Sequence, residues 1–91
     1  MSDFLIERYV SRANATQVDA DAERARIAAE EMTGEGADVR HLRSIFIPED
    51  ETCLDLYRAP SAEAVREAAT RAGLVFDRIT EVRESSGRPG T

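Results

Sequence analysis

Ionisable side chains that could bind a ligand or move a proton lie on the first strand-like segment and near the middle of the chain. His41 is the single histidine, and near neutral pH an imidazole can bind a metal ion or act as a general base. Carboxylates at Glu7 and Asp55 could complete a site for a divalent metal. The sequence therefore presents Glu7, His41 and Asp55 as candidate ligands of an ion such as nickel or zinc.

Some of the same residues could instead serve an enzyme that needs no cofactor. In that case His41 or Asp55 would transfer a proton, Arg43 would hold an oxyanion, and Tyr57 would orient a small organic substrate. The reaction would be an isomerisation, a cyclisation or a monooxygenase-like step. A structural role for the lone histidine, and packing for Tyr57, are the alternatives to both kinds of site.

Cysteine usage and charge restrict the class of protein. Cys53 is the single cysteine, so there is no internal disulfide, and a reducing compartment is expected. The formal charge is −6 and every basic residue is an arginine, without a basic stripe, so nucleic acid is not an expected partner. No apolar run approaches the roughly 18 residues of a membrane span. We expect a cytoplasmic protein without a membrane partner.

Periodicity predicts the elements that must hold the candidate site residues. Strand-like alternation marks residues 3–10, 39–47, 52–58 and 76–83, and helical spacing marks one segment capped by Thr16 and another capped by Ser61. The order β-α-β-β-α-β predicts the α+β class and a ferredoxin-like sandwich, with a four-stranded antiparallel sheet and both helices on one face. We expect a single domain over residues 1–84 and a flexible tail over 85–91.

Two helices leave the other face of such a sheet open, and strand alternation indicates which residues lie there. With Phe4, Ile6, Leu42, Phe46, Leu54 and Leu56 facing the helices, the open face would hold Leu5, Glu7, Tyr9, His41, Arg43, Ile45, Cys53, Asp55 and Tyr57. Because this set mixes apolar and charged groups, we expect two copies to pack sheet to sheet around a small polar pocket, as a dimeric α+β barrel. An interface of satisfied ion pairs without a ligand is the alternative.

Several segments together resemble a known bacterial family. Residues 57–69 (YRAPSAEAVREAA), 72–74 (AGL) and 77–83 (DRITEVR), with the opening 4–8 (FLIER), are similar to small nickel-binding proteins common in actinobacteria. The resemblance spans nearly the whole chain and implies a ferredoxin-like fold, a homodimer and divalent-metal binding. Members often carry a Trp-Val-His-Ser-Tyr pattern on the second strand. Here the histidine of that pattern falls on Arg43, and a cysteine that members often carry falls on Asp55.

Three functions follow from these observations. The first is a small dimeric protein that binds a ligand, with a divalent metal such as nickel as the candidate. The second is a cofactor-free enzyme of the dimeric α+β-barrel type, favoured by Arg43 because a guanidinium suits an anionic or oxygen-rich organic ligand better than a metal. The third is an association module whose sheet face serves only to join two copies.

Overall fold

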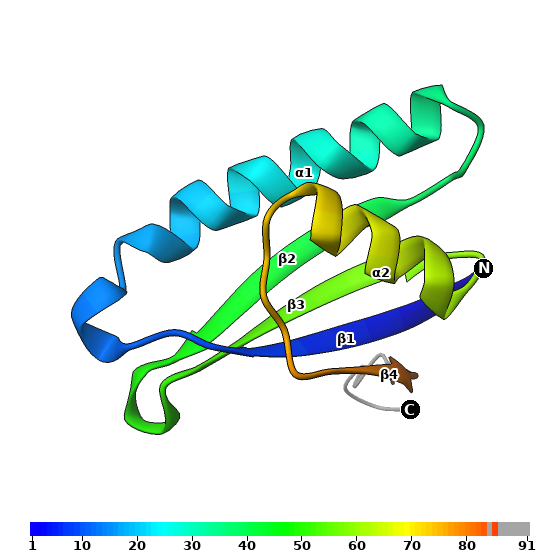
Figure 1. The fold of residues 1–91 in the computed structure, drawn as a ribbon. Helices are drawn as coiled ribbons and strands as arrows, with labels where there is room; N and C mark the ends of the chain where they lie inside the picture. Colours follow the sequence, from blue (N-terminus) through cyan, green and yellow to red (C-terminus); the bar gives the residue numbers. More distant parts are fainter. Residues whose placement is uncertain (84, 86–91) are drawn as a thin grey trace, which may run out of the picture.

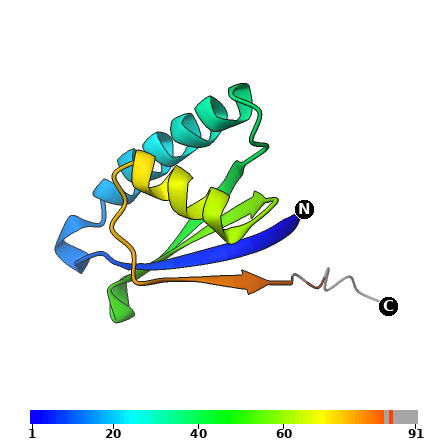
Figure 2. The ribbon, with the colours of Figure 1, turned by 45° about the vertical axis from the view of Figure 1, so that its right-hand side comes forward.

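The fold is a single antiparallel sheet with both helices on one of its faces. The computed structural model describes residues 1–83 and 85. The strands are β1 (Ser2–Tyr9), β2 (Arg40–Ile47), β3 (Thr52–Ala59) and β4 (Arg78–Val82), in the spatial order β2-β3-β1-β4. Helices α1 (Gln17–Gly34) and α2 (Ala62–Arg71) lie side by side over the sheet (Figures 1 and 2). This arrangement confirms the predicted ferredoxin-like α+β fold.

Local chemistry explains where α2 begins and ends. The Ser61 hydroxyl accepts a hydrogen bond from the Ala64 amide at 3.2 Å, as expected for an N-cap. At the other end Gly73 has a φ of +79°, and the Leu74 amide donates to the Ala69 carbonyl at 3.0 Å, which closes the helix in a Schellman motif. The predicted cap of α1 is not formed by a side chain, because Thr16 makes no capping hydrogen bond.

Two short 3-10 helices, η1 (Arg12–Asn14) and η2 (Pro48–Asp50), connect β1 to α1 and β2 to β3. The last strand is shorter than the predicted range 76–83. The predicted tail, residues 85–91, lies outside the described residues apart from residue 85. Among the described residues, no helix is both long enough and apolar enough to cross a membrane.

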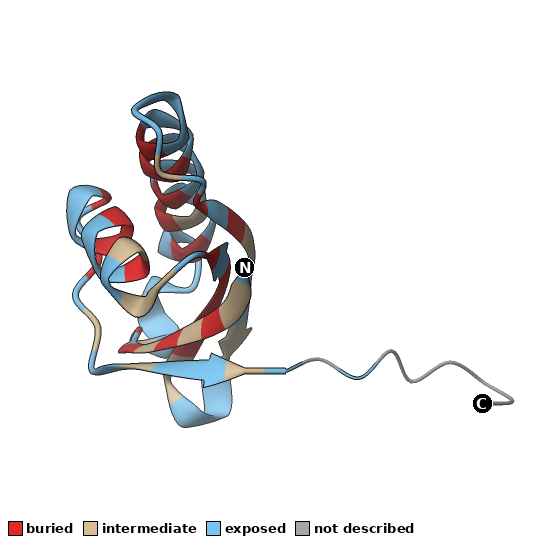
Figure 3. Cartoon of the chain, turned by 90° about the vertical axis from the view of Figure 1, so that its right-hand side faces the viewer, coloured by how far each residue is buried: buried red, intermediate tan, exposed pale blue. Residues whose placement is uncertain are grey.

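The core lies between the helices and the sheet, where Figure 3 shows the buried residues of both layers. Small alanines on the buried side of α1 and α2 allow both helices to lie close to the strands. Val39, Tyr57 and Val65 are among its largest fully buried side chains. Within residues 1–83 and 85, no helix lies over the other face of the sheet (Figure 2).

Strand pairing shows that the predicted faces of β3 were wrong. Directly opposed residues of an antiparallel pair point to the same face, and β1 pairs with β3 as Phe4 with Tyr57, Ile6 with Asp55 and Arg8 with Cys53. Since Phe4 and Ile6 are core residues, the side chains of Cys53, Asp55 and Tyr57 lie under the helices. Leu54 and Leu56 lie on the open face instead.

A β-bulge in β2 changes which residues of that strand share a face. His41 pairs with Tyr57 and Arg43 pairs with Leu56, the preceding residue of β3, so Leu42 is an extra residue. His41 consequently lies under the helices, which corrects its predicted place on the open face. Arg43 is exposed and lies on the open face, as predicted.

Candidate functional site

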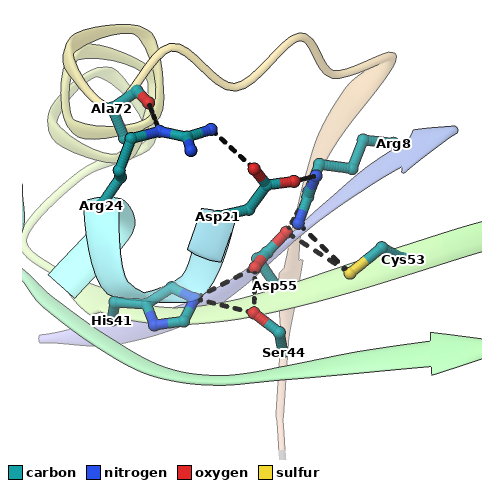
Figure 4. A network of polar contacts seen from close by, with 8 residues as sticks. All are labelled: Arg8, Asp21, Arg24, His41, Ser44, Cys53, Asp55 and Ala72. Carbon is teal, nitrogen blue, oxygen red and sulfur yellow. Dashed lines mark hydrogen bonds and ion pairs between the residues drawn. The ribbon is translucent and has the colours of Figure 1, made fainter. Parts of the chain in front are cut away.

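A buried polar cluster lies between α1 and the sheet, with the carboxylate of Asp55 at its centre (Figure 4). Asp55 is fully buried. Its Oδ2 accepts a hydrogen bond from Arg8 Nε at 2.7 Å, and its Oδ1 lies 3.0 Å from His41 Nε2. The Ser44 hydroxyl donates to the same Oδ1. Strands β1 and β2 therefore both contribute partners to this one carboxylate of β3.

The guanidinium of Arg8 joins this carboxylate to α1. Its Nη1 donates to Asp21 Oδ2 at 2.8 Å, and its Nη2 lies 3.4 Å from Cys53 Sγ. Asp21 also accepts from Arg24 at 2.6 Å, and Arg24 Nε donates to the Ala72 carbonyl at 3.1 Å. The contacts thus run without a break from β2, through the sheet and α1, to the end of α2 (Figure 4).

The charges of the cluster are balanced, with two guanidiniums beside two carboxylates. Burial acts to raise the pKa of Asp55, but hydrogen bonds from His41, Ser44 and Arg8 outweigh it and hold that pKa below its ordinary value of 3.8. Burial also opposes the charge on Arg8, whose pKa is nevertheless raised by its bonds to Asp55 and Asp21. Both groups are therefore charged at neutral pH.

The thiol of Cys53 is protonated at neutral pH. Burial, and then the negative charge of Asp55, raise its pKa to about 11. A thiol is a poor nucleophile in this state because the thiolate is the reactive form.

His41, Ser44 and Asp55 do not form a nucleophilic triad. In a triad the carboxylate and the hydroxyl contact different nitrogens of the imidazole. Here His41 Nε2 faces both groups, with Asp55 Oδ1 at 3.0 Å and Ser44 Oγ at 3.3 Å. Because the carboxylate can only accept, Nε2 carries a proton in this arrangement. The geometry supports a rigid polar core rather than an activated hydroxyl.

Tyr57 lies beside the cluster with its hydroxyl unsatisfied. Its ring packs edge-on against the imidazole of His41, with 5.1 Å between the ring centroids. The hydroxyl is buried and has no hydrogen-bond partner among the described residues. Burial, and then the charge of Asp55, raise the pKa of Tyr57. The phenol is consequently a neutral group, held in the core by packing.

The structure brings some of the sequence-predicted site residues together and separates others. His41, Asp55 and Tyr57 lie under the helices, whereas Glu7 and Arg43 lie on the open face. Glu7 forms an ion pair with Arg78 there. The three candidate metal ligands therefore do not converge in one copy. The four candidate catalytic residues do not converge either, since Arg43 is on the opposite side of the sheet from His41.

The cavity beside His41 does not restore the enzyme arrangement. It has a volume of about 310 Å³ and is bordered by Asp38 and Arg40, and Arg43 does not line it. A pocket with His41 as the base and Arg43 as the oxyanion holder is thus not formed by a single copy.

Four side chains of the cluster (Arg8, Asp21, Arg24 and Ser44) were not predicted as site residues from the sequence, although three of them carried a signal. Arg8 shares the strand alternation of Phe4 and Ile6, which places it on the helix side. Asp21 follows the apolar Val18 by three residues and precedes Ala25 by four, so it belongs to the buried stripe of α1. Ser44 alternates with Phe46, which places it on the helix side as well, but its contact with Asp55 depends on strand pairing and is not visible in the sequence.

The fold and its helix-covered polar core define a small ferredoxin-like α+β protein. The family described as nickel responsive protein SCO4226-like matches residues 4–82, and the chain belongs to this family. A similar solved structure is the crystal structure of SCO4226 from Streptomyces coelicolor A3(2), with 28% sequence identity and a TM-score of 0.74. The match covers 93% of this chain and 100% of that one. A search of curated proteins found no match.

The buried cluster does not fit a nickel ion as it stands. Both oxygens of Asp55 already accept hydrogen bonds, and the guanidinium of Arg8 lies between the carboxylates of Asp55 and Asp21. Within the described residues, no three His, Cys, Asp or Glu side chains are placed to hold a metal ion. A nickel response in this chain therefore needs another arrangement of donors.

Proposed function

We propose that this protein is a small homodimeric ligand-binding protein. Two copies associate through the open face of the sheet, and a divalent cation such as nickel is the candidate ligand. The observation that carries the proposal is the apolar centre of this open face, which no helix of the described part of the chain covers.

The apolar residues of the open face form a continuous patch across three strands. Ile45 of β2 pairs with Leu54 of β3, and Leu56 of β3 pairs with Leu5 of β1. Ile45 is 45% exposed and Tyr9, on the same face of β1, is 66% exposed. Leu5 and Leu54 are half-buried and Leu56 is buried, so the accessible apolar surface is chiefly that of Ile45 and Tyr9. Exposed apolar surface gathered on one face of a protein marks an association site. A second copy offers the same patch about a two-fold axis, which is the usual symmetry of small homo-oligomers.

The charged residues around the apolar patch are compatible with its being covered by a second copy of the protein. Glu7 pairs with Arg78, and Asp3 accepts a hydrogen bond from Arg58 at 2.9 Å. Because these carboxylates have their counter-ions within the chain, association would not bury them uncompensated. Such pairs are also typical of the polar rim around an apolar interface centre.

Nickel binding, under this proposal, depends on the dimer. No group of three metal-binding side chains is assembled within the described part of one copy, so a site with several protein donors needs residues from both. Glu7 is the candidate ligand that faces the open side, and it would exchange its contact with Arg78 for the cation. The family description as nickel responsive supports this ligand.

A matched pair of substitutions tests the association. Ile45→Glu places a charge on the open face, and Ile27→Glu places the same charge on α1, where the side chain is equally exposed at 46%. We expect a dimeric mass by size exclusion with light scattering for the wild type and for Ile27→Glu, and a monomer for Ile45→Glu. A monomeric wild type, or equal effects of both substitutions, would contradict association through this face.

Calorimetric titration with nickel tests the ligand on the same three proteins. We expect binding by the two dimeric proteins and none by the monomeric variant. If the dimeric proteins give no heat beyond the buffer control, the cation is not the ligand and the protein is an association module. If the monomer binds as tightly as the dimer, the coupling of the site to association is wrong.

A further inference from the structure

We propose that Arg8 is the permanent cation of the buried cluster. Its guanidinium takes the place that a divalent metal ion would take among Asp21, Cys53, Asp55 and His41. The proposal concerns the helix side of the sheet and does not depend on association through the open face.

The contacts of Arg8 are those of a cation surrounded by donors. Its three nitrogens each face a different side chain: Nε faces Asp55, Nη1 faces Asp21 and Nη2 faces Cys53, at 2.7, 2.8 and 3.4 Å. Arg8 is only 5% exposed. Each of the three nitrogens thus has an acceptor, and the two contacts with carboxylates are charge-assisted hydrogen bonds, which are the strong kind.

The side chains around the guanidinium form a donor set suited to a borderline-soft divalent ion. Two carboxylates, one thiol and one imidazole are the groups that zinc, cobalt and nickel accept as ligands. Cys53 Sγ lies 4.0 Å from Asp55 Oδ2, and His41 Nε2 lies 3.0 Å from the other oxygen of the same carboxylate. Asp21 approaches from α1. The guanidinium separates the two carboxylates and the thiol, because each contacts a different nitrogen of Arg8, whereas His41 contacts Asp55 and not Arg8.

Charge balance indicates what must change when the guanidinium is removed. Among the carboxylates and guanidiniums, Arg8 and Arg24 balance Asp21 and Asp55. Without Arg8 the cluster carries one uncompensated negative charge. A divalent ion in place of the guanidinium would again supply positive charge between the two carboxylates.

A cobalt(II) titration tests the proposal, because a cobalt–thiolate bond produces a charge-transfer band in the near ultraviolet. Cys53 is the only cysteine, so this band reports on the buried cluster and not on a site at the open face. The proteins are the wild type, Arg8→Ala and Arg24→Ala. The last is the matched control, because Arg24 also contacts Asp21 but does not lie between the two carboxylates.

We expect a saturable band at one cobalt per chain for Arg8→Ala, and no band for the wild type or Arg24→Ala. Adding Cys53→Ser to Arg8→Ala should abolish the band. A thiolate band in the wild type would overturn the proposal, as would a folded Arg8→Ala that binds no cobalt.

Arg8→Ala leaves two buried carboxylates without their cation and can unfold for that reason. In that case we expect cobalt to restore the far-ultraviolet circular dichroism of the wild type together with the thiolate band. A variant that stays unfolded at saturating cobalt refutes the replacement of Arg8 by a metal. Nickel binding at the open face can succeed or fail without altering these outcomes.

Discussion

Asp55→Asn should destabilise the protein more than any other single isosteric exchange at a carboxylate. The substitution keeps the shape of the side chain but removes the charge that faces Arg8 at 2.7 Å. An amide oriented to accept from His41 and Ser44 turns its own NH2 towards Arg8 Nε, so two donors meet. Arg8 is then a buried cation that retains only Asp21 as a charged partner.

The size of the loss follows from the burial of both partners. Side chains of Arg8 and Asp55 are 5% and 0% exposed, and breaking a buried pair by removing one charge costs about 3–5 kcal/mol. A chain of 91 residues has a free energy of unfolding of about 5–14 kcal/mol. The loss is therefore a large part of the total, and a fall in Tm of at least about 12 °C is expected.

Urea unfolding followed by circular dichroism measures this loss, since the chain has no tryptophan for fluorescence. Glu35→Gln is the control, because Glu35 pairs with Arg71 on the surface, where ion pairs contribute little. A loss for Asp55→Asn below about 1 kcal/mol would be no more than a surface pair contributes. That result would refute the assignment of the cluster as a structural core.

Three further outcomes are expected. Tyr57→Phe should leave the protein equally stable or more stable by about 1 kcal/mol in urea unfolding, because it removes a buried hydroxyl without a partner; a clear destabilisation would mean that the hydroxyl is satisfied by water. The folded-state pKa of Asp55 lies below its unfolded value of 3.8. The ionised carboxylate therefore contributes fully to the free energy of unfolding above pH 3.8, and this contribution is lost as the pH falls through the lowered pKa. Asp55→Asn should remove this acid dependence of stability. The pKa of Cys53 is raised from 9.0 to about 11. The protonated thiol therefore contributes fully to the free energy of unfolding below pH 9, and this contribution is lost as the pH rises to about 11. Cys53→Ser should flatten this alkaline decline, and an unchanged slope would contradict the burial of the thiol.

The fold could be predicted because its signals are local. The Ser61 cap, the glycine at the end of α2 and the strand alternation are each readable within a few residues, and their order restricts the topology. The site could not be predicted in the same way, because it depends on strand pairing. β3 is a central strand with apolar residues on both faces, so Leu54 and Leu56 do not identify the helix side.

Polar residues on the helix side of the sheet made the two faces of β3 harder still to tell apart. Alternation with Leu54 and Leu56 assigned Asp55 to the open face. Burying its carboxylate is costly, and the cost is offset here by three donors from other strands. No local pattern predicts that these donors meet. The buried positions of Arg8 and Asp21 could be predicted from strand alternation and helical spacing, but only by allowing a charged residue to lie on an otherwise apolar face.

The bulge at Leu42 also affects how copies of the protein can assemble. β2 is an edge strand of the sheet, with unpaired backbone groups that could accept a strand from another chain. An extra residue kinks this edge, and the exposed Arg40 and Arg43 on either side of it make continuation of the sheet by a foreign strand unfavourable. Open-ended growth of the sheet into fibrils is thereby disfavoured, whereas a closed pair formed face to face is not.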